Sequence, residues 1–323
     1  MIEAVGLRKV YGKKVAVQDL SFTVRPGIVT GFLGPNGSGK STTMRMIVGL
    51  DRPSAGQALV DGKPFAQHRA PLSTVGALLD AKAVHTGRSA HKHLLAMAAT
   101  AGIPRSRVDE VIDLVGLGEV ARKRAGGFSL GMGQRLGIAS ALLGDPSTVM
   151  FDEPVNGLDP DGILWIRNLM KELAGQGRAV FVSSHLMSEM ALTAEHLVVI
   201  GRGRLIADES VKAFVDRVQP RGVTVRSPQA EQLRDLVAAE GGRLAAMDDG
   251  SFDVRGLSAE RIGDAAARRG LPLHELTTVK ASLEEAFMEL TANAVEYQAH
   301  GPAGGGPLTV PGAPAPAREE VAR

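Results

Sequence analysis

Apolar runs alternate with amphipathic stretches along much of this chain. Short, nearly uninterrupted apolar runs, such as residues 28–33, are typical of strands buried on both faces of a parallel sheet. Residues 163–173 instead carry apolar positions at helical spacing. This alternation predicts an α/β fold with a mainly parallel sheet. Strands are expected at residues 28–33, 58–60, 76–79, 148–151, 179–182, 197–200 and 204–207, and helices at 41–48, from 128–135 through 143, and at 163–173.

Two regions before residue 150 depart from this alternation. Residues 1–26 alternate single apolar and polar positions around turns, which predicts short antiparallel strands. Residues 90–101 and 107–115 have helical spacing and are separated by a Gly-Ile-Pro breaker. We therefore expect a mixed sheet with antiparallel N-terminal strands and a helical subdomain at about 86–145, all within one domain of residues 1–215.

From residue 222 the organisation restarts. The pattern predicts the element order β-α-β-β-α-β, with a hairpin turning at residues 248–250 and a closing helix at 282–290. This order suggests a small split-βαβ domain of the α+β class over residues 222–291, without recognisable chemistry. Residues 300–323 are rich in glycine, proline and alanine and are expected to be a disordered tail.

Composition narrows the class of protein only slightly. A formal net charge of +2 over 323 residues, without basic clusters interleaved with aromatic residues, does not favour a nucleic-acid partner. The absence of cysteine excludes disulfides and thiolate metal sites. No apolar run approaches the roughly 18 residues of a membrane helix, and the N-terminus lacks a signal-peptide pattern. We expect a cytoplasmic protein, and any membrane span would come from another chain.

The strongest candidate for chemistry lies between the apolar run 28–33 and the helix that starts near residue 41. Glycine, four residues and then Gly-Lys-Ser form a phosphate-binding loop pattern. In this context backbone N–H groups and a helix N-terminus converge on one point, where they can hold a polyphosphate. Lys40 would reach the β- and γ-phosphates, and the Ser41 hydroxyl would ligate Mg²⁺. The loop consists of Gly34, Pro35, Asn36, Gly37, Ser38, Gly39, Lys40, Ser41 and Thr42.

Two other strand ends carry candidate groups. The apolar run 148–151 enters Asp152 and Glu153, of which the first can hold Mg²⁺ and the second can take a proton from an attacking water. His185 follows the run 179–182, at the expected carboxyl end of a parallel strand. Tyr11 precedes the phosphate loop and is either a stacking platform for a base or a strand aromatic; position alone leaves both open.

Together these residues resemble the ATP-binding subunit of an ATP-binding-cassette (ABC) transporter, over about residues 2–215. The resemblance implies that residues 34–42 are the Walker A motif and residues 149–153 the Walker B motif with its catalytic glutamate. It further implies that Tyr11 stacks on adenine and that His185 senses the γ-phosphate. Asp159 falls in the D-loop, and Ser129 and Gly131 are the retained residues of the signature motif, which would touch the γ-phosphate of a facing nucleotide.

Asp80 stands where this family usually has glutamine. An acid here is similar to one branch of single-cassette exporters, which handle antibiotics, lantibiotic peptides and related drugs. That branch often has a small C-terminal α/β domain and a permease on a separate chain. The resemblance therefore implies that Asp80 couples the ATP site to a permease and is a further candidate Mg²⁺ ligand.

The resemblance also implies an ATP-dependent homodimer. One chain has one Walker A motif and one signature, and in the family these serve opposite halves of each site, so two chains would close over two Mg-ATP molecules. The subunit would lie on the cytoplasmic face of the membrane. A soluble ABC ATPase that remodels ribosomes or DNA is the alternative. It is less favoured because the chain has neither a second cassette nor a long coiled coil, and no guanine-reading Asn-Lys-x-Asp supports a GTP switch.

Overall fold

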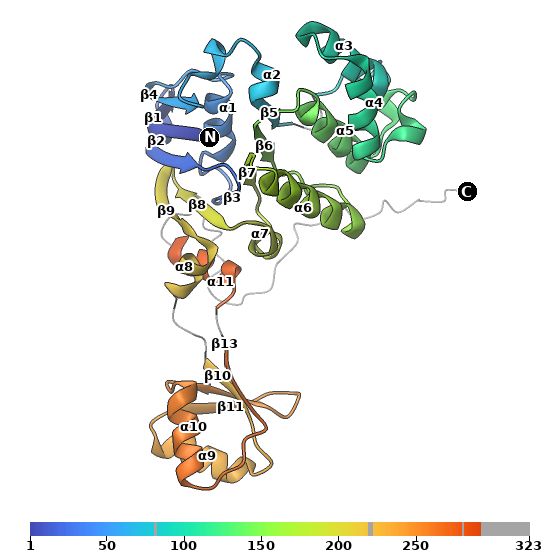
Figure 1. The fold of residues 1–323 in the computed structure, drawn as a ribbon. Coiled ribbons are helices and arrows are strands. Elements are labelled where there is room, and N and C mark those ends of the chain that lie inside the picture. The colour runs from blue at the N-terminus through green and yellow to red at the C-terminus, as the bar shows by residue number, and fades with distance from the viewer. Residues whose placement is uncertain (81–82, 219–221, 280, 292–323) are drawn as a thin grey trace, which may run out of the picture.

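A six-stranded sheet forms the centre of the larger lobe in the computed structural model, which describes residues 1–80, 83–218, 222–279 and 281–291 (Figure 1). Its order is β5-β6-β7-β3-β8-β9, and only the pairing of β8 with β9 is antiparallel. Every residue of β3 and β7 is buried, which explains their continuous apolar runs. The predicted α/β fold with a mixed sheet is confirmed. Its strands are β3 (Val29–Leu33), β5 (Val75–Leu78), β6 (Thr148–Asp152), β7 (Ala179–Ser183), β8 (His196–Gly201) and β9 (Arg204–Ser210).

The N-terminal residues form a separate antiparallel sheet in the order β2-β1-β4, as their alternating pattern predicts. These strands are β1 (Ile2–Tyr11), β2 (Lys14–Val24) and β4 (Ala55–Val60). An aromatic cluster joins the two sheets: the ring centroid of Phe22 on β2 lies 5.6 Å from those of Phe32 on β3 and Phe181 on β7. Helix α1 (Lys40–Ile47) packs in the same apolar core. This core therefore holds the start of α1 at a constant place relative to the end of β3.

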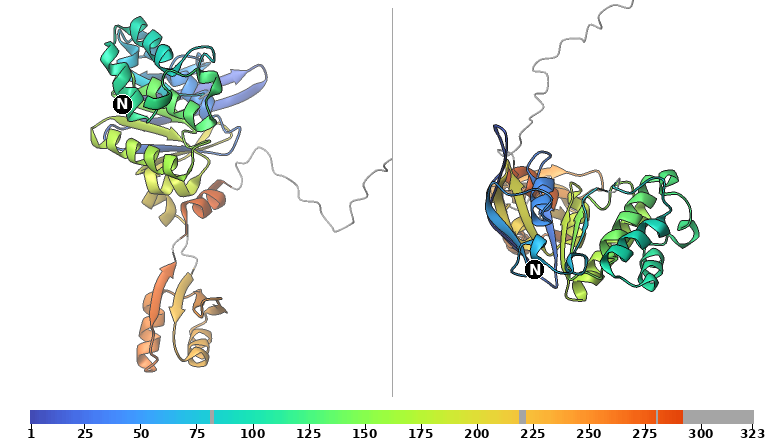
Figure 2. Two further views of the ribbon diagram at one scale, coloured as in Figure 1. Left: turned by 90° about the vertical axis from the view of Figure 1, so that its right-hand side faces the viewer. Right: turned by 90° about the horizontal axis from the view of Figure 1, so that it is seen from above.

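The helical insert extends to one side of the central sheet (Figures 1 and 2). It contains α3 (Ala90–Ala101), α4 (Arg105–Leu114) and α5 (Leu130–Leu142), which contact one another. Helix α5 also packs closely against β5, because a Cβ on Gly76 would lie only 1.9 Å from the carbonyl oxygen of Ala141. Glycine at this position thus lets the insert lie directly on the sheet.

Other helices and 3₁₀ turns also belong to the larger lobe. They include α2 (Pro71–Thr74), α6 (Pro160–Gly175), α7 (Met187–Thr193) and α8 (Val211–Asp216), with 3₁₀ turns at Phe65–Gln67, Gly118–Val120 and Ala125–Gly127. Within the described residues, every helix is too short or too polar to cross a bilayer.

Residues 222–279 form a smaller lobe with its own apolar core. Its four-stranded sheet has the order β11-β12-β10-β13 with antiparallel neighbours, which is the split-βαβ arrangement that the element order suggests. The strand expected at residues 273–276 begins later, because Glu275 is the residue that pairs with Arg226 at the end of β10. The elements are β10 (Gly222–Arg226), α9 (Ala230–Ala239), β11 (Arg243–Ala246), β12 (Phe252–Arg255), α10 (Ala259–Arg268) and β13 (Glu275–Val279).

The last described helix, α11 (Leu283–Thr291), differs from the expectation that it closes the small domain. It contacts α7 and α8 of the larger lobe, and Leu283, Ala286 and Phe287 belong to the core beneath the central sheet. Their helical spacing makes an apolar stripe, which needs an apolar partner but does not say which. The chain thus leaves the larger lobe after α8 and returns to it at α11. The expected tail at 300–323 lies outside the described residues.

Phe287→Ala is expected to destabilise the larger lobe, although Phe287 follows the small lobe in the sequence. Phe287 is 9% exposed in the shared core, and deleting a buried aromatic ring costs about 3 kcal/mol or more. Denaturant unfolding followed by the fluorescence of the single tryptophan, Trp165 on α6, measures this loss.

Met288→Ala is the matched control, because Met288 is the next residue of α11 and is 66% exposed. It should leave the unfolding midpoint nearly unchanged. Equal midpoints for both variants and the unsubstituted chain would contradict the docking of α11.

Candidate nucleotide-binding site

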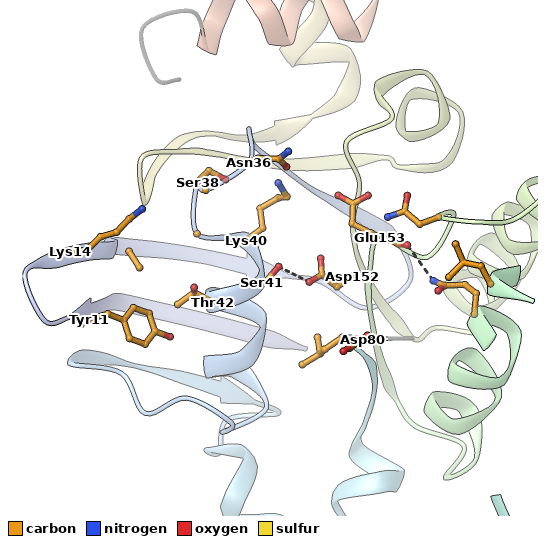
Figure 3. Close-up of a pocket in the computed structure, with 17 residues that line it drawn as sticks. Tyr11, Lys14, Asn36, Ser38, Lys40, Ser41, Thr42, Asp80, Asp152 and Glu153 are labelled. Atoms are coloured by element: carbon orange, nitrogen blue, oxygen red, sulfur yellow. Dashed lines mark hydrogen bonds between the residues drawn. The ribbon is translucent and has the colours of Figure 1, made fainter. Parts of the chain in front are cut away.

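A cavity of about 580 Å³ lies where the carboxyl ends of β3 and β6 meet the start of α1 (Figure 3). Ligands of open α/β sheets bind at such an edge. Most of the residues that line it belong to predicted motifs. They are Tyr11, Lys14, Ala16, Asn36, Gly37, Ser38, Gly39, Lys40, Ser41, Thr42, Leu79, Asp80, Leu130, Gln134, Asp152, Glu153 and Asn156.

The loop between β3 and α1 depends on its glycines. Gly37 and Gly39 have φ of 80° and 106°, a left-handed conformation that disfavours a side chain. A Cβ on Gly34 would lie 2.5 Å from both the carbonyl oxygen of Ile200 and the hydroxyl of Ser38. Gly34 and Pro35 are not among the lining residues, but their carbonyls face Lys40 inside the loop. The loop is therefore held tightly around the N-terminus of α1.

Lys40 lies across this loop. Its ammonium donates to the carbonyl oxygen of Gly34 at 2.6 Å and approaches that of Pro35 at 3.4 Å. Burial lowers the pKa of Lys40, while the nearby carboxylates of Glu153 and Asp152 act in the opposite direction. A phosphate group in the cavity would offer this cation stronger acceptors than two carbonyls.

Oxygen ligands suitable for Mg²⁺ meet at one point of the cavity. The Ser41 hydroxyl donates to Oδ2 of Asp152 at 2.7 Å, and the Ser183 hydroxyl donates to Oδ1 of the same carboxylate. A hydroxyl and a carboxylate are hard oxygen donors of the kind that Mg²⁺ prefers. Asp80 follows β5 and lines the same cavity. These residues fit a Mg²⁺ ion next to bound phosphates.

Glu153 and His185 form a second pair. Nδ1 of His185 lies 2.6 Å from Oε2 of Glu153, and the His185 backbone N–H donates to the same oxygen at 3.3 Å. Glu153 has a φ of 53°, which is unfavourable for any residue other than glycine. The carboxylate is therefore held in place by its surroundings rather than by its own backbone preference.

Two residues outside the predicted site hold the Glu153 backbone. The Glu153 N–H donates to the Ser183 hydroxyl at 3.0 Å, and the buried Gln134 amide donates to the Glu153 carbonyl at 3.3 Å. Ser183 is opposite Asp152 in the pairing of β6 with β7. Only this register, which the sequence does not state, brings it to both acids. Lys14 also lines the cavity, although no motif predicts it. Its place three residues after Tyr11, in the first turn, is the feature of the sequence that could have indicated it.

Tyr11 lies at the far end of the cavity. Its ring is 47% exposed, and its hydroxyl donates to Asp51 at 3.0 Å. The Lys9 ammonium lies 4.9 Å from the ring centroid. Burial, followed by the hydrogen bond to Asp51, raises the pKa of the Tyr11 phenol. The ring is thus held in one orientation with area left for stacking.

The predicted signature and D-loop residues lie apart from Lys40. Ser129 caps α5 by accepting from the Met132 N–H at 3.2 Å, and Asp159 caps α6 by accepting from the Gly162 N–H at 3.0 Å. A Cβ on Gly131 would lie 2.9 Å from the carbonyl oxygen of Gly157, so the two segments touch. None of Ser129, Gly131 and Asp159 lines the nucleotide cavity, although Leu130, which lies between the two signature residues, does.

Comparison with known proteins agrees with this geometry. A family model described as "ABC transporter" matches residues 17–156, which contain Lys40, Asp152 and Glu153. Over 304 residues the chain is 34% identical to YhcH of Bacillus subtilis, an ABC transporter ATP-binding protein, across 93% of this chain and 99% of YhcH. This chain belongs to the ABC transporter family. It is an ATP-binding subunit.

Two further comparisons describe this ABC protein's cassette. It is 39% identical over 211 residues to the bacitracin transport ATP-binding protein BcrA of Bacillus licheniformis, across 64% of this chain and 69% of BcrA. The solved cassette MJ0796, a dimer in a post-hydrolysis state bound to ADP and phosphate, matches with a TM-score of 0.60 and 22% identity, across 65% of this chain and 98% of that one. At this identity the likeness concerns the fold alone. A domain of unknown function (DUF8746) matches residues 221–284.

Ser183→Ala is expected to slow ATP hydrolysis by this ABC subunit about tenfold while ATP binding changes little. The substitution removes the hydroxyl that donates to Asp152 and accepts from the Glu153 N–H, and loss of such supporting contacts typically costs 10–100-fold. Phosphate release and ATP binding, measured side by side, test this.

Ser147→Ala is the control, because Ser147 immediately precedes β6 at the opposite end of the sheet from Asp152. Its turnover should equal that of the unsubstituted chain. A Ser183→Ala rate equal to the Ser147→Ala rate would mean that the hydroxyl does not orient the acids.

Proposed function

We propose that this ABC subunit hydrolyses Mg-ATP as a homodimer and powers export through a permease on a separate chain. The observation that carries the proposal is the meeting of Lys40, Ser41, Asp152 and Glu153 in one cavity, in a chain whose relatives are transport ATP-binding proteins. The role of each residue follows from its place there.

ATP would lie with its phosphates in the loop around α1 and its base against Tyr11. Lys40 would exchange its carbonyl contacts for phosphate oxygens, and the loop N–H groups would bind the rest. Ser41 and Asp152, with Asp80 as a further candidate, would hold Mg²⁺. The ion, when bound, neutralises charge on the phosphate oxygens.

Glu153 is the proposed general base. It accepts a proton from water as that water attacks the γ-phosphorus, the bond from the γ-phosphorus to the β–γ bridging oxygen breaks, and ADP and phosphate result. His185 contacts the Glu153 carboxylate directly, so it can orient that carboxylate and also respond to the γ-phosphate.

The place of the signature residues supports a dimer. Ser129 is exposed and lies outside the cavity that contains Lys40. A site that needs both would take Lys40 from one chain and Ser129 and Gly131 from the other. The post-hydrolysis structure of a similar cassette is likewise dimeric.

A second cavity supports coupling to a permease. It measures about 490 Å³, lies between the central sheet and the helical insert, and has mainly apolar walls that include Leu50, Phe65 and Met97. Asp80 lines both this cavity and the nucleotide cavity. A permease segment seated in it would therefore act on the ATP site through Asp80.

The relatives support export of an antibiotic-like peptide as the class of transport, since BcrA is a bacitracin transport protein. They support transport over the alternative of a soluble ATPase that remodels ribosomes or DNA. Identifying the membrane protein that co-purifies with this subunit is the direct test of the permease.

Glu153→Gln is expected to bind ATP like the unsubstituted chain but to lose hydrolysis by about 10²–10⁴-fold, because the amide cannot accept the proton. With ATP it should accumulate as a dimer in size-exclusion chromatography with light scattering. Adding Ser129→Arg should abolish that dimer, whereas Lys40→Ala should weaken ATP binding itself.

Hydrolysis by Glu153→Gln at the unsubstituted rate would show that Glu153 is not the base. A Glu153→Gln chain that remains monomeric with saturating ATP would contradict the shared site.

Asp80→Ala is expected to reduce transport more than hydrolysis once the permease is present, since its carboxylate links the two cavities. Substrate transport and phosphate release in the same vesicles give the ratio. Asp109→Ala, which removes an acid on α4 of the helical insert, should leave the ratio unchanged. Parallel loss of ATP binding, hydrolysis and transport would make Asp80 an ordinary nucleotide-site residue.

A further inference from the structure

Helix α7 begins two residues after His185 and has little stability of its own. It spans only Met187–Thr193, and no side chain caps its N-terminus. Helices this short are marginal in water, so their position depends on tertiary contacts. His185 is joined to it through Leu186, its N-cap residue. The contacts of α7 therefore decide where His185 lies relative to Glu153.

Apolar packing holds one side of α7 but leaves a gap on another. Met190 packs against β3 so closely that a Cβ on Gly31 would lie 2.7 Å from its sulfur. Between α7 and α6, however, a small void of about 10 Å³ remains, lined by apolar side chains that include Ile166 and Met170. Apolar contact between these two helices is therefore incomplete at this point.

An ion pair spans α6 and α7 beside that void. Nη2 of Arg167 on α6 donates to Oε2 of Glu189 on α7 at 2.6 Å, and both side chains line the void. They are only 21% and 23% exposed. The buried Nε of Arg167 has no hydrogen-bond partner among the described residues. Such a partly desolvated pair adds little net stability but is sensitive to the loss of either partner.

Each of these two helices begins next to a predicted functional residue. Helix α6 begins after its cap, Asp159, the predicted D-loop residue, and α7 begins two residues after His185. Pro154, which follows Glu153, lines the void beside the ion pair. Ser184, which precedes His185, lines the same void, so the residues next to both Glu153 and His185 adjoin the space beside the ion pair. On another side, α7 contacts α11, which returns from the small lobe.

We propose that Arg167 and Glu189 are positioning residues that hold α7 at the distance from α6 at which His185 contacts Glu153. Through this pair, a shift of α6 at its Asp159 end moves His185. The proposal rests on the proposed function, because it assigns the pair to the hydrolytic step and not to ATP binding.

Arg167→Ala and Glu189→Ala are expected to lower kcat about tenfold or more while the ATP dissociation constant stays within about twofold. A conservative Arg167→Lys keeps the charge and should recover part of kcat. The double variant Arg167→Glu with Glu189→Arg should recover activity above either alanine variant. Glu240→Ala, which removes the 2.9 Å ion pair with Arg261 in the small lobe, is the control and should retain kcat.

A purely structural pair would change thermal stability and leave kcat of the folded protein intact. Unchanged kcat in both alanine variants would therefore contradict the proposal. So would a double variant that is as stable as the unsubstituted chain but no faster than the alanine variants. Glu153→Gln is measured in parallel: its failure to slow hydrolysis would contradict the proposed function, whereas slow Glu153→Gln beside fast Glu189→Ala contradicts only the positioning role.

Discussion

The site depends on one carboxylate held from two sides. Asp152 ends β6, accepts from Ser41 at the start of α1 and accepts from Ser183 at the end of β7. These hydrogen bonds connect three elements that are far apart in the sequence and adjacent at one edge of the sheet. Figure 3 shows the bond between Ser41 and Asp152. Because a parallel sheet brings all its carboxyl ends to the same edge, every other group of the site is placed relative to this point.

The order of strands then decides which groups can cooperate. β7 lies between β6 and β3, so its last residue can contact Asp152 and hold the Glu153 backbone, while the next turn supplies His185. The left-handed backbone of Glu153 is unfavourable locally and persists because the neighbouring strand satisfies its N–H group. The paired strands of the sheet thus fix the direction in which the Glu153 carboxylate points.

The small lobe is joined to the cassette at both of its ends, through the chain after α8 and through α11. The small lobe has its own core, yet α11 adds Phe287 to the core of the cassette beside α7. Helix α7 therefore receives contacts from β3, α6 and α11 and leads directly from His185. A shift of any of these elements can therefore move α7 and change the contact between Glu153 and His185.

The sequence by itself determined most of the elements and predicted the chemistry of the main motifs. Continuous apolar runs are sufficient to recognise strands buried on both faces. A glycine-rich loop that ends in Lys40 and Ser41 is typical of phosphate binding, because the glycines allow the left-handed backbone of the loop and the lysine can contact phosphate. The acids at residues 152 and 153 could be placed at the same cavity, because they end a buried strand whose carboxyl end lies at the ligand-binding edge of the sheet.

Only the tertiary structure decided which distant residues support these motifs. Ser183 and Gln134 are ordinary residues in sequence, and strand register and helix packing alone bring them to Glu153. The partner of α11 was likewise open, because an apolar stripe specifies that a surface must be covered but carries no information about which surface covers it. Local patterns thus determined the elements, whereas non-local packing determined the neighbours of each functional group.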